Sequence, residues 1–275
     1  MRPSPLPDFP PSPEPSESAA LPRLWAALPA LLLIALAATL APGGRNQEIF
    51  IILNDAAAGW LSPTLWSAIT LGGSVTGTIA LFAPTLKTQA RWLASAFLAA
   101  PFAILFSEGG KRYFDVMRPA GVLQPESFTL IGQKLYLHAF PSGHATTAFL
   151  AAAVVILAWP KAATRGRAAT ALLGAAALVA FSRIAVGAHW PLDVLTGAAG
   201  GWLAGVLGTW LSARLRFWQK PGGVRAMAAV SLAVSLALLF LDLGYPLAHI
   251  YQIGLAAWGI GGAAAALMKT PEEYA

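Results

Sequence analysis

The sequence contains no cysteine and few charged residues, and both absences narrow the kind of protein it can be. Without cysteine, the chain forms neither disulfide bonds nor thiolate metal sites. Charged residues make up 11% of the 275 residues, whereas a soluble domain carries about 25%. Hydrophobic residues make up 57% of the chain, which predicts a polytopic membrane protein built as one bundle of helices.

The charged residues and histidines of the chain give little support to nucleic-acid binding or to a metal site. Basic side chains outnumber acidic ones by 18 to 12, but they are scattered over short loops. Nucleic-acid binding would mass them in a tail or along one helix, so we expect no nucleic-acid partner. The 4 histidines and 12 carboxylates show no close metal-ligand pattern such as HExxH. These residues still leave a metal site possible.

Composition divides the chain into three parts. Residues 1–22 are rich in proline and serine and predict a disordered cytoplasmic tail. Residues 23–220 predict a transmembrane core, and residues 221–275 predict an appended C-terminal hairpin in which we recognise no chemistry. The apolar stretches, each near the ~20 residues that cross a bilayer, are 24–41, 65–86, 91–107, 144–160, 168–187, 191–211, 225–243 and 250–268. The segment 47–64 reads as an interfacial helix or re-entrant elbow. The prediction is an all-α bundle of eight spans, six in the core and two appended.

The distribution of Lys and Arg predicts the orientation of these spans. With the N-terminus inside, twelve of the 18 basic residues fall on the inner side and six on the outer side. The outer six are Arg45, Lys111, Arg112, Arg118, Lys134 and Arg183. We therefore expect an inner (plasma) membrane protein of a bacterium, with its polar loops facing the periplasm or outside.

Three short polar segments interrupt the apolar chain and hold the candidate site residues. They are Lys111 with Arg118-Pro119, then Pro141-Ser142-Gly143-His144, then Ser182-Arg183 with His189 and Asp193. The chain from His144 to Arg183 is long enough to cross the membrane and return, so all three segments are expected at one surface. Ionisable residues are costly near a bilayer and persist where they meet each other or a charged ligand.

Each segment has a structural reading and a functional one. Ser142 is placed to cap a helix whose free N–H groups can hold phosphate oxygens, or to serve only as a cap. His189 and Asp193, four residues apart, either orient an imidazole for nucleophilic attack or only secure a helix end. The cations either grip phosphate or lie at the interface as extended side chains. Glu108 and Asp115 are expected to pair with Lys111 or Arg112.

Together the segments resemble the type 2 phosphatidic acid phosphatase superfamily, whose signature is KxxxxxxRP, PSGH and SRxxxxxHxxxD. The chain reads KRYFDVMRP at 111–119, PSGH at 141–144 and SRIAVGAHWPLD at 182–193. All three blocks are intact, in order and correctly spaced. The resemblance covers about residues 65–211, and the same scaffold is related to that of the vanadium haloperoxidases, which are soluble.

The resemblance implies a role for each site residue. His189 would be the nucleophile that forms a phosphohistidine, Asp193 would orient it, and His144 would protonate the leaving oxygen. The implied phosphate-binding residues are Lys111, Arg118, Ser142, Gly143 and Arg183. This scheme requires no metal and no other cofactor, because the cations neutralise the developing charge.

The implied activity is hydrolysis of a lipid phosphomonoester or diphosphate on the outer leaflet. Candidate substrates are undecaprenyl diphosphate, phosphatidylglycerophosphate, phosphatidate and the phosphorylated glucosamine of lipid A. Two alternatives are a lipid phosphotransferase and a non-catalytic phospholipid-binding or transport protein. Intact His144, His189 and Asp193 argue against the last, because binding alone needs neither a nucleophile nor an acid.

Overall fold

The computed structural model describes residues 23–268, so the predicted tail at 1–22 lies outside the described residues. Within that range the regular elements are all helices, which confirms the predicted all-α class. The longer helices are α1 (Arg23–Leu40), α2 (Arg45–Trp60), α3 (Pro63–Leu71), α4 (Val75–Phe82), α5 (Ala90–Phe114), α7 (Gly143–Leu157), α8 (Ala162–Ala185), α9 (Pro191–Leu215), α10 (Pro221–Leu238) and α11 (His249–Leu267). Short helical turns lie at Ala83–Lys87, Pro119–Val122 (α6), Pro125–Ser127, Phe217–Gln219 and Pro246–Ala248.

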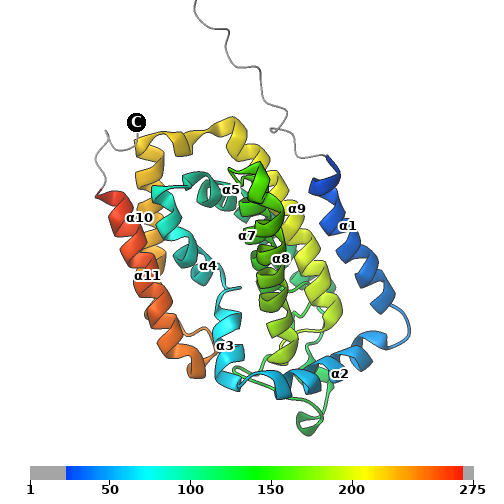
Figure 1. The fold of residues 1–275 in the computed structure, drawn as a ribbon. Coiled ribbons are helices and arrows are strands. Elements are labelled where there is room, and N and C mark those ends of the chain that lie inside the picture. The colour runs from blue at the N-terminus through cyan, green and yellow to red at the C-terminus, as the bar shows by residue number, and fades with distance from the viewer. Residues whose placement is uncertain (1–22, 269–275) are drawn as a thin grey trace, which may run out of the picture.

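The bundle is centred on α7 and α9. Helix α9 packs against α7, α5 and α1, and α8 packs against α7. Helices α10 and α11 form an antiparallel hairpin on the opposite side of the molecule from α1, with α4 between the hairpin and the core (Figure 1). Helix α2 crosses the end of the bundle where α1 ends and α3 begins.

A row of glycines on α9 allows it to lie very close to α7. A Cβ added at Gly197 or Gly201 would collide with the backbone of Ser142 or Thr146, near the start of α7. Small residues at four-residue spacing are the usual means by which membrane helices approach backbone to backbone. This contact draws the start of α7 against the start of α9, where two of the three polar segments lie.

Two apolar stretches are bent rather than straight. Helices α1 and α2 meet at 106°, and the bend lies between Leu40 and Arg45, just before the segment 47–64 that reads as an interfacial helix or re-entrant elbow. The stretch 65–86, predicted as one span, is two helices, α3 and α4, that meet at 71°. The break falls where glycine is followed by Ser74, whose hydroxyl accepts a hydrogen bond from the Gly77 N–H and so begins a new helix.

The described residues contain five helices that are long and apolar enough to cross a membrane, or up to seven spans if each bent pair is one. Helix α7 is apolar but has only 15 residues. The protein is therefore a multi-pass membrane protein. The count of eight spans and the division at residue 220 stay predictions.

Candidate active site

The three polar segments lie together at one end of the bundle. Lys111 is in the last turn of α5, and Arg118 follows in the connecting loop. Ser142, Gly143 and His144 begin α7. Arg183 is in the last turn of α8, and His189 and Asp193 flank the start of α9. The structure thus gathers the residues that the sequence singled out.

His189 is enclosed between a cation and a carboxylate. Its Nε2 lies 3.1 Å from Nη1 of Arg118, and its Nδ1 lies 3.5 Å from Oδ2 of Asp193. A guanidinium N–H only donates, so Nε2 accepts and the ring proton belongs on Nδ1, facing Asp193. At 3.5 Å that second contact is an ion-pair distance and not yet a hydrogen bond, which leaves Nδ1 without a partner among the described residues.

The environment of His189 favours the neutral imidazole. The residue is only 2% exposed, and this burial is the main cause that lowers its pKa well below the ordinary value. The positive charges of Arg118 and then Arg183 lower the pKa further. A neutral ring with a proton on Nδ1 has its lone pair on Nε2, which is the state that a nucleophile requires.

Backbone contacts hold His189 and Asp193 in register with α7 and α8. The carbonyl of Arg183 accepts hydrogen bonds from the N–H groups of Ala188 and His189, at 3.0 and 3.2 Å. The Ser142 N–H donates to the carbonyl of Asp193 at 3.0 Å. The carboxylate of Asp193 accepts from the Trp190 N–H at 2.9 Å and so caps α9. These bonds make the ends of three helices one rigid unit.

Arg118 is fixed by backbone carbonyl groups. Its Nε donates to Leu137 at 2.9 Å, Nη1 to Ala188 at 2.9 Å and Nη2 to His138 at 3.2 Å. The residue is buried, and two of these carbonyls belong to the loop between α6 and α7. The guanidinium therefore stands beside Nε2 of His189 in one defined orientation.

Arg183 is held by side chains instead. Its Nη1 donates to the hydroxyls of Thr70 and Tyr245, both at 2.6 Å. The Nε of the same group is buried and has no partner within the described residues. An unpaired buried N–H of this kind can donate a hydrogen bond to an anionic ligand.

The start of α7 completes the polar end of the site. Ser142 is fully buried and caps the helix by accepting a hydrogen bond from the Ala145 N–H at 3.5 Å. His144 and Gly143 line a cavity together with Lys111. Free N–H groups at a helix start and the nearby ammonium group make this a favourable place for phosphate oxygens.

Of the two acidic residues near the site, Glu108 forms the predicted ion pair and Asp115 does not. Glu108 contacts Lys111 at 2.5 Å, as expected. Asp115 was expected to pair with Lys111 or Arg112, but its contact is with Nδ1 of His138 at 3.1 Å. Asp115 adopts a left-handed conformation after the last residue of α5, with φ 44°, which turns the chain away from the helix.

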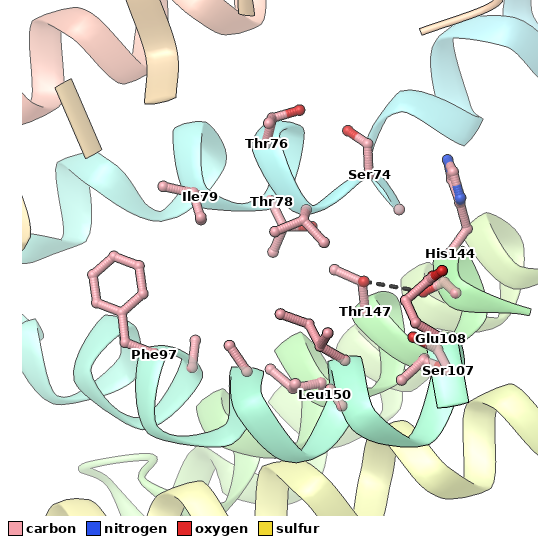
Figure 2. A pocket seen from close by; sticks show the side chains of 18 of the residues that line it. Ser74, Thr76, Thr78, Ile79, Phe97, Ser107, Glu108, His144, Thr147 and Leu150 are labelled. Carbon is pink, nitrogen blue, oxygen red and sulfur yellow. Dashed lines mark hydrogen bonds between the residues drawn. The ribbon is translucent and has the colours of Figure 1, made fainter. Parts of the chain in front are cut away.

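An apolar cavity opens from this polar end. It has a volume of about 390 Å³ and lies between α4, α5 and α7 (Figure 2). Glu108 and His144 line one end, and Ile79 and Phe97 line the other. Lys111, which contacts Glu108, also lines the cavity. Since Phe97 and Glu108 are on one helix, the cavity follows α5 for about 16 Å. Its lining is mostly apolar.

Two residues that contact the site were not identified from the sequence. Thr70 lies in the last turn of α3. Tyr245 lies in the turn between α10 and α11, the hairpin in which the sequence shows no recognisable chemistry. Neither belongs to a motif, and they lie 113 and 62 residues from Arg183. Pairings of that kind are set by tertiary packing and leave no local sequence signal.

Within residues 23–268 no group of three or more His, Asp or Glu side chains could hold a metal ion. Metal independence stays a prediction for the activity assay. The site has three cations instead: Lys111, Arg118 and Arg183.

These features define a class: a polytopic membrane protein with three cationic side chains and two histidines gathered at one end of a helical bundle. The model of the PAP2 superfamily matches residues 89–217, which include all three polar segments. The chain is 30% identical over 176 residues to an undecaprenyl-diphosphatase of Sulfolobus acidocaldarius, covering 62% of this chain and 76% of the relative. It is 38% identical over 96 residues to a putative undecaprenyl-diphosphatase of Escherichia coli, covering 34% of this chain and 43% of the relative.

Two solved structures share the fold. LpxE of Aquifex aeolicus matches with a TM-score of 0.53 and 25% identity, covering 61% of this chain and 96% of that one. A PAP2-type phosphatidylglycerolphosphate phosphatase of Bacillus subtilis matches with a TM-score of 0.53 and 19% identity, covering 70% and 98%. The chain belongs to the PAP2 superfamily, and the resemblance stated from its motifs is confirmed.

Proposed function

We propose that this protein hydrolyses a phosphomonoester or diphosphate of a membrane lipid through a phosphohistidine intermediate. The observation that carries the proposal is the arrangement of His189. Its Nε2 meets Arg118 at 3.1 Å, while Nδ1 faces Asp193. This arrangement prepares one nitrogen as a nucleophile beside a cation that can bind the phosphoryl group.

In the first step a phosphoryl oxygen replaces His189 as the acceptor of Arg118 Nη1, which frees Nε2 to attack phosphorus. The N–P bond forms as the bond from phosphorus to the lipid oxygen breaks. The electron pair of the broken bond passes to that oxygen, which takes a proton from His144. Asp193 stabilises the positive charge that appears on the imidazole.

In the second step His144 removes a proton from water, and the water oxygen attacks phosphorus. The electrons of the P–N bond return to Nε2, and inorganic phosphate leaves. Throughout, Lys111, Arg118 and Arg183 neutralise the equatorial oxygens, with the amides at the start of α7.

The apolar cavity supports a lipid as the substrate. A hydrocarbon chain that lies between α4 and α5 would bring its phosphate to the end lined by Lys111 and His144. We propose undecaprenyl diphosphate first among the candidates because two relatives carry that substrate in their names, one of them as a putative undecaprenyl-diphosphatase. The other candidates are phosphatidylglycerophosphate, phosphatidate and lipid A.

The proposal is tested with purified protein in lipid nanodiscs. We expect release of inorganic phosphate from at least one of these four lipids, in the presence of EDTA, and no release by His189→Ala. A phosphoryl group trapped on His189 by acid-labile labelling would support the intermediate. Labelling of another residue, or activity that EDTA abolishes and Mg²⁺ restores, would reject the mechanism.

The two alternatives give different products in the same assay. A phosphotransferase would move labelled phosphate to an added lipid alcohol or lipid phosphate and release less of it to water. A non-catalytic binding protein would retain each lipid unchanged. Hydrolysis that is insensitive to added lipid acceptors supports the phosphatase.

The proposed outer-leaflet orientation rests on the placement of Lys and Arg. Because the native chain has no cysteine, single cysteines report sidedness without background. Gln133→Cys, in the loop beside the site, should react with an impermeant thiol reagent in intact spheroplasts. Thr164→Cys, at the opposite end of the bundle, should react only after the membrane is opened. The reverse pattern would place the site in the cytoplasm.

A further inference from the structure

The C-terminal hairpin reaches the phosphate site through one side chain. Tyr245, in the turn between α10 and α11, accepts a hydrogen bond from Nη1 of Arg183 at 2.6 Å. Its ring also lies 5.6 Å from the guanidinium carbon of the same residue. The hairpin lies beyond residues 89–217, where the superfamily model matches.

The turn that carries Tyr245 is fixed against the loop between α6 and α7. The Gln133 N–H donates to the carbonyl of Gly244 at 2.9 Å, and the Gly244 N–H donates to Oδ1 of Asp242 at 2.7 Å. Gly132 provides space for the tyrosine ring, since a Cβ there would lie 2.7 Å from two ring carbons. The phenol therefore has a defined position.

That position determines which edge of Arg183 is free. Nη1 donates both to Tyr245 and to Thr70, whereas Nε is buried without a partner in the described part of the chain. Two acceptors on one nitrogen fix the plane of the guanidinium. They leave the Nε edge available for a side-on contact with an anion.

We propose that Tyr245 is a positioning residue of the active site, and that the C-terminal hairpin contributes to phosphate binding by orienting Arg183. The inference rests on the proposed function, because it assigns Arg183 to the phosphoryl group. The tyrosine acts through Arg183 and does not itself touch the substrate.

The test compares two tyrosines of the hairpin. Tyr245→Phe keeps the ring and its packing but removes the hydroxyl. Tyr251→Phe, on the exposed side of α11, is the matched control. Binding of orthovanadate, a phosphate analogue, is measured by titration calorimetry, and kcat and KM are measured with the lipid that the wild-type protein hydrolyses.

We expect Tyr245→Phe to weaken vanadate binding and raise KM by about tenfold, which is the typical effect of losing one hydrogen bond to a charged group. The unfolding temperature without vanadate should match that of the wild type, because the ring still packs against Gly132. Tyr251→Phe should match the wild type in every measurement.

Repeating the Tyr245→Phe substitution in an Arg183→Met variant tests whether the tyrosine acts through Arg183 or has a general structural role. In Arg183→Met the guanidinium is absent, so adding Tyr245→Phe should change vanadate affinity by less than twofold. An equal loss in both backgrounds would overturn the proposal, and so would unchanged vanadate binding and KM in Tyr245→Phe alone. Failure of the wild-type protein to bind vanadate or release phosphate would instead reject the phosphate site itself.

Discussion

The two buried arginines of the site are held in opposite ways. Arg118 donates to three backbone carbonyls, and two of these belong to the loop that joins the first and second motifs. Arg183 donates to two hydroxyl groups, on α3 and on the C-terminal hairpin. One cation is thus oriented by the main chain of the superfamily region, and the other by side chains outside it.

The difference determines how substitutions of neighbouring residues affect the contacts of each arginine. A carbonyl is present whatever residue carries it, so the contacts of Arg118 survive substitution of its neighbours. The contacts of Arg183 exist only because residues 70 and 245 carry hydroxyl groups. The orientation of Arg183 is therefore the part of this site that a single substitution elsewhere in the chain can change.

Replacing each arginine by lysine should show the largest effects and separate the two roles. Arg118→Lys and Arg183→Lys should each lower kcat/KM by about a hundredfold or more, because lysine cannot form the forked contact to phosphate. Only Arg118→Lys should also destabilise the fold, by about 2 kcal/mol, since it leaves the buried carbonyl of Ala188 and two part-buried carbonyls without their donor. Steady-state kinetics and thermal unfolding measure the two effects. Equal loss of stability in both variants would contradict the comparison.

The pH dependence gives a second, smaller contrast. Burial, Arg118 and Arg183 lower the pKa of His189, in that order of effect, from an ordinary value of 6.5. A lowered pKa means that the ring takes up its proton only at more acidic pH. The neutral form of His189, the proposed nucleophile, therefore persists as the pH falls through 6.5, and the acid limb of kcat/KM should lie below that value.

Removing either positive charge should move that limb toward neutral pH. We expect a larger shift for Arg118→Gln than for Arg183→Gln, because Arg118 has the larger effect on the pKa of His189. The substrate ionises identically with every variant, so differences between the profiles belong to the protein. A larger shift for Arg183→Gln, or a wild-type limb above pH 6.5, would be inconsistent with this order.

The sequence predicted the helical class and the gathering of its motifs because both depend on regular patterns. Apolar stretches of bilayer length predict helices, and the distance from His144 to Arg183 allows one crossing and a return. The capping role of Ser142 depends only on the adjacent sequence, and Ser142 does cap α7 in the structure. These inferences need no knowledge of how the helices pack.

The features that sequence reasoning missed depend on packing between distant segments. The stretch 65–86 reads as one span, yet the chain bends by 71° before Ser74 starts a new helix. The hairpin lacks a motif, so its composition marks it only as an addition. Its contact with Arg183 depends on the space beside Gly132 and on a turn fixed by Asp242. Neither condition is visible in composition or spacing.

The smallest expected effect tests the second partner of Arg183. Thr70→Val keeps the size of a fully buried side chain but removes the hydroxyl that accepts from Nη1. We expect KM and the vanadate dissociation constant to rise about threefold, with kcat nearly unchanged, because Tyr245 still holds the same nitrogen.

Thr64→Val, on the same helix, is the matched control and should match the wild type. A loss in Thr70→Val as large as that in Arg183→Lys would mean that one hydroxyl, not two, fixes the guanidinium. If Thr70→Val changes neither KM nor the vanadate dissociation constant, Tyr245 alone orients the guanidinium of Arg183. The claim that both hydroxyl groups orient it would then be wrong.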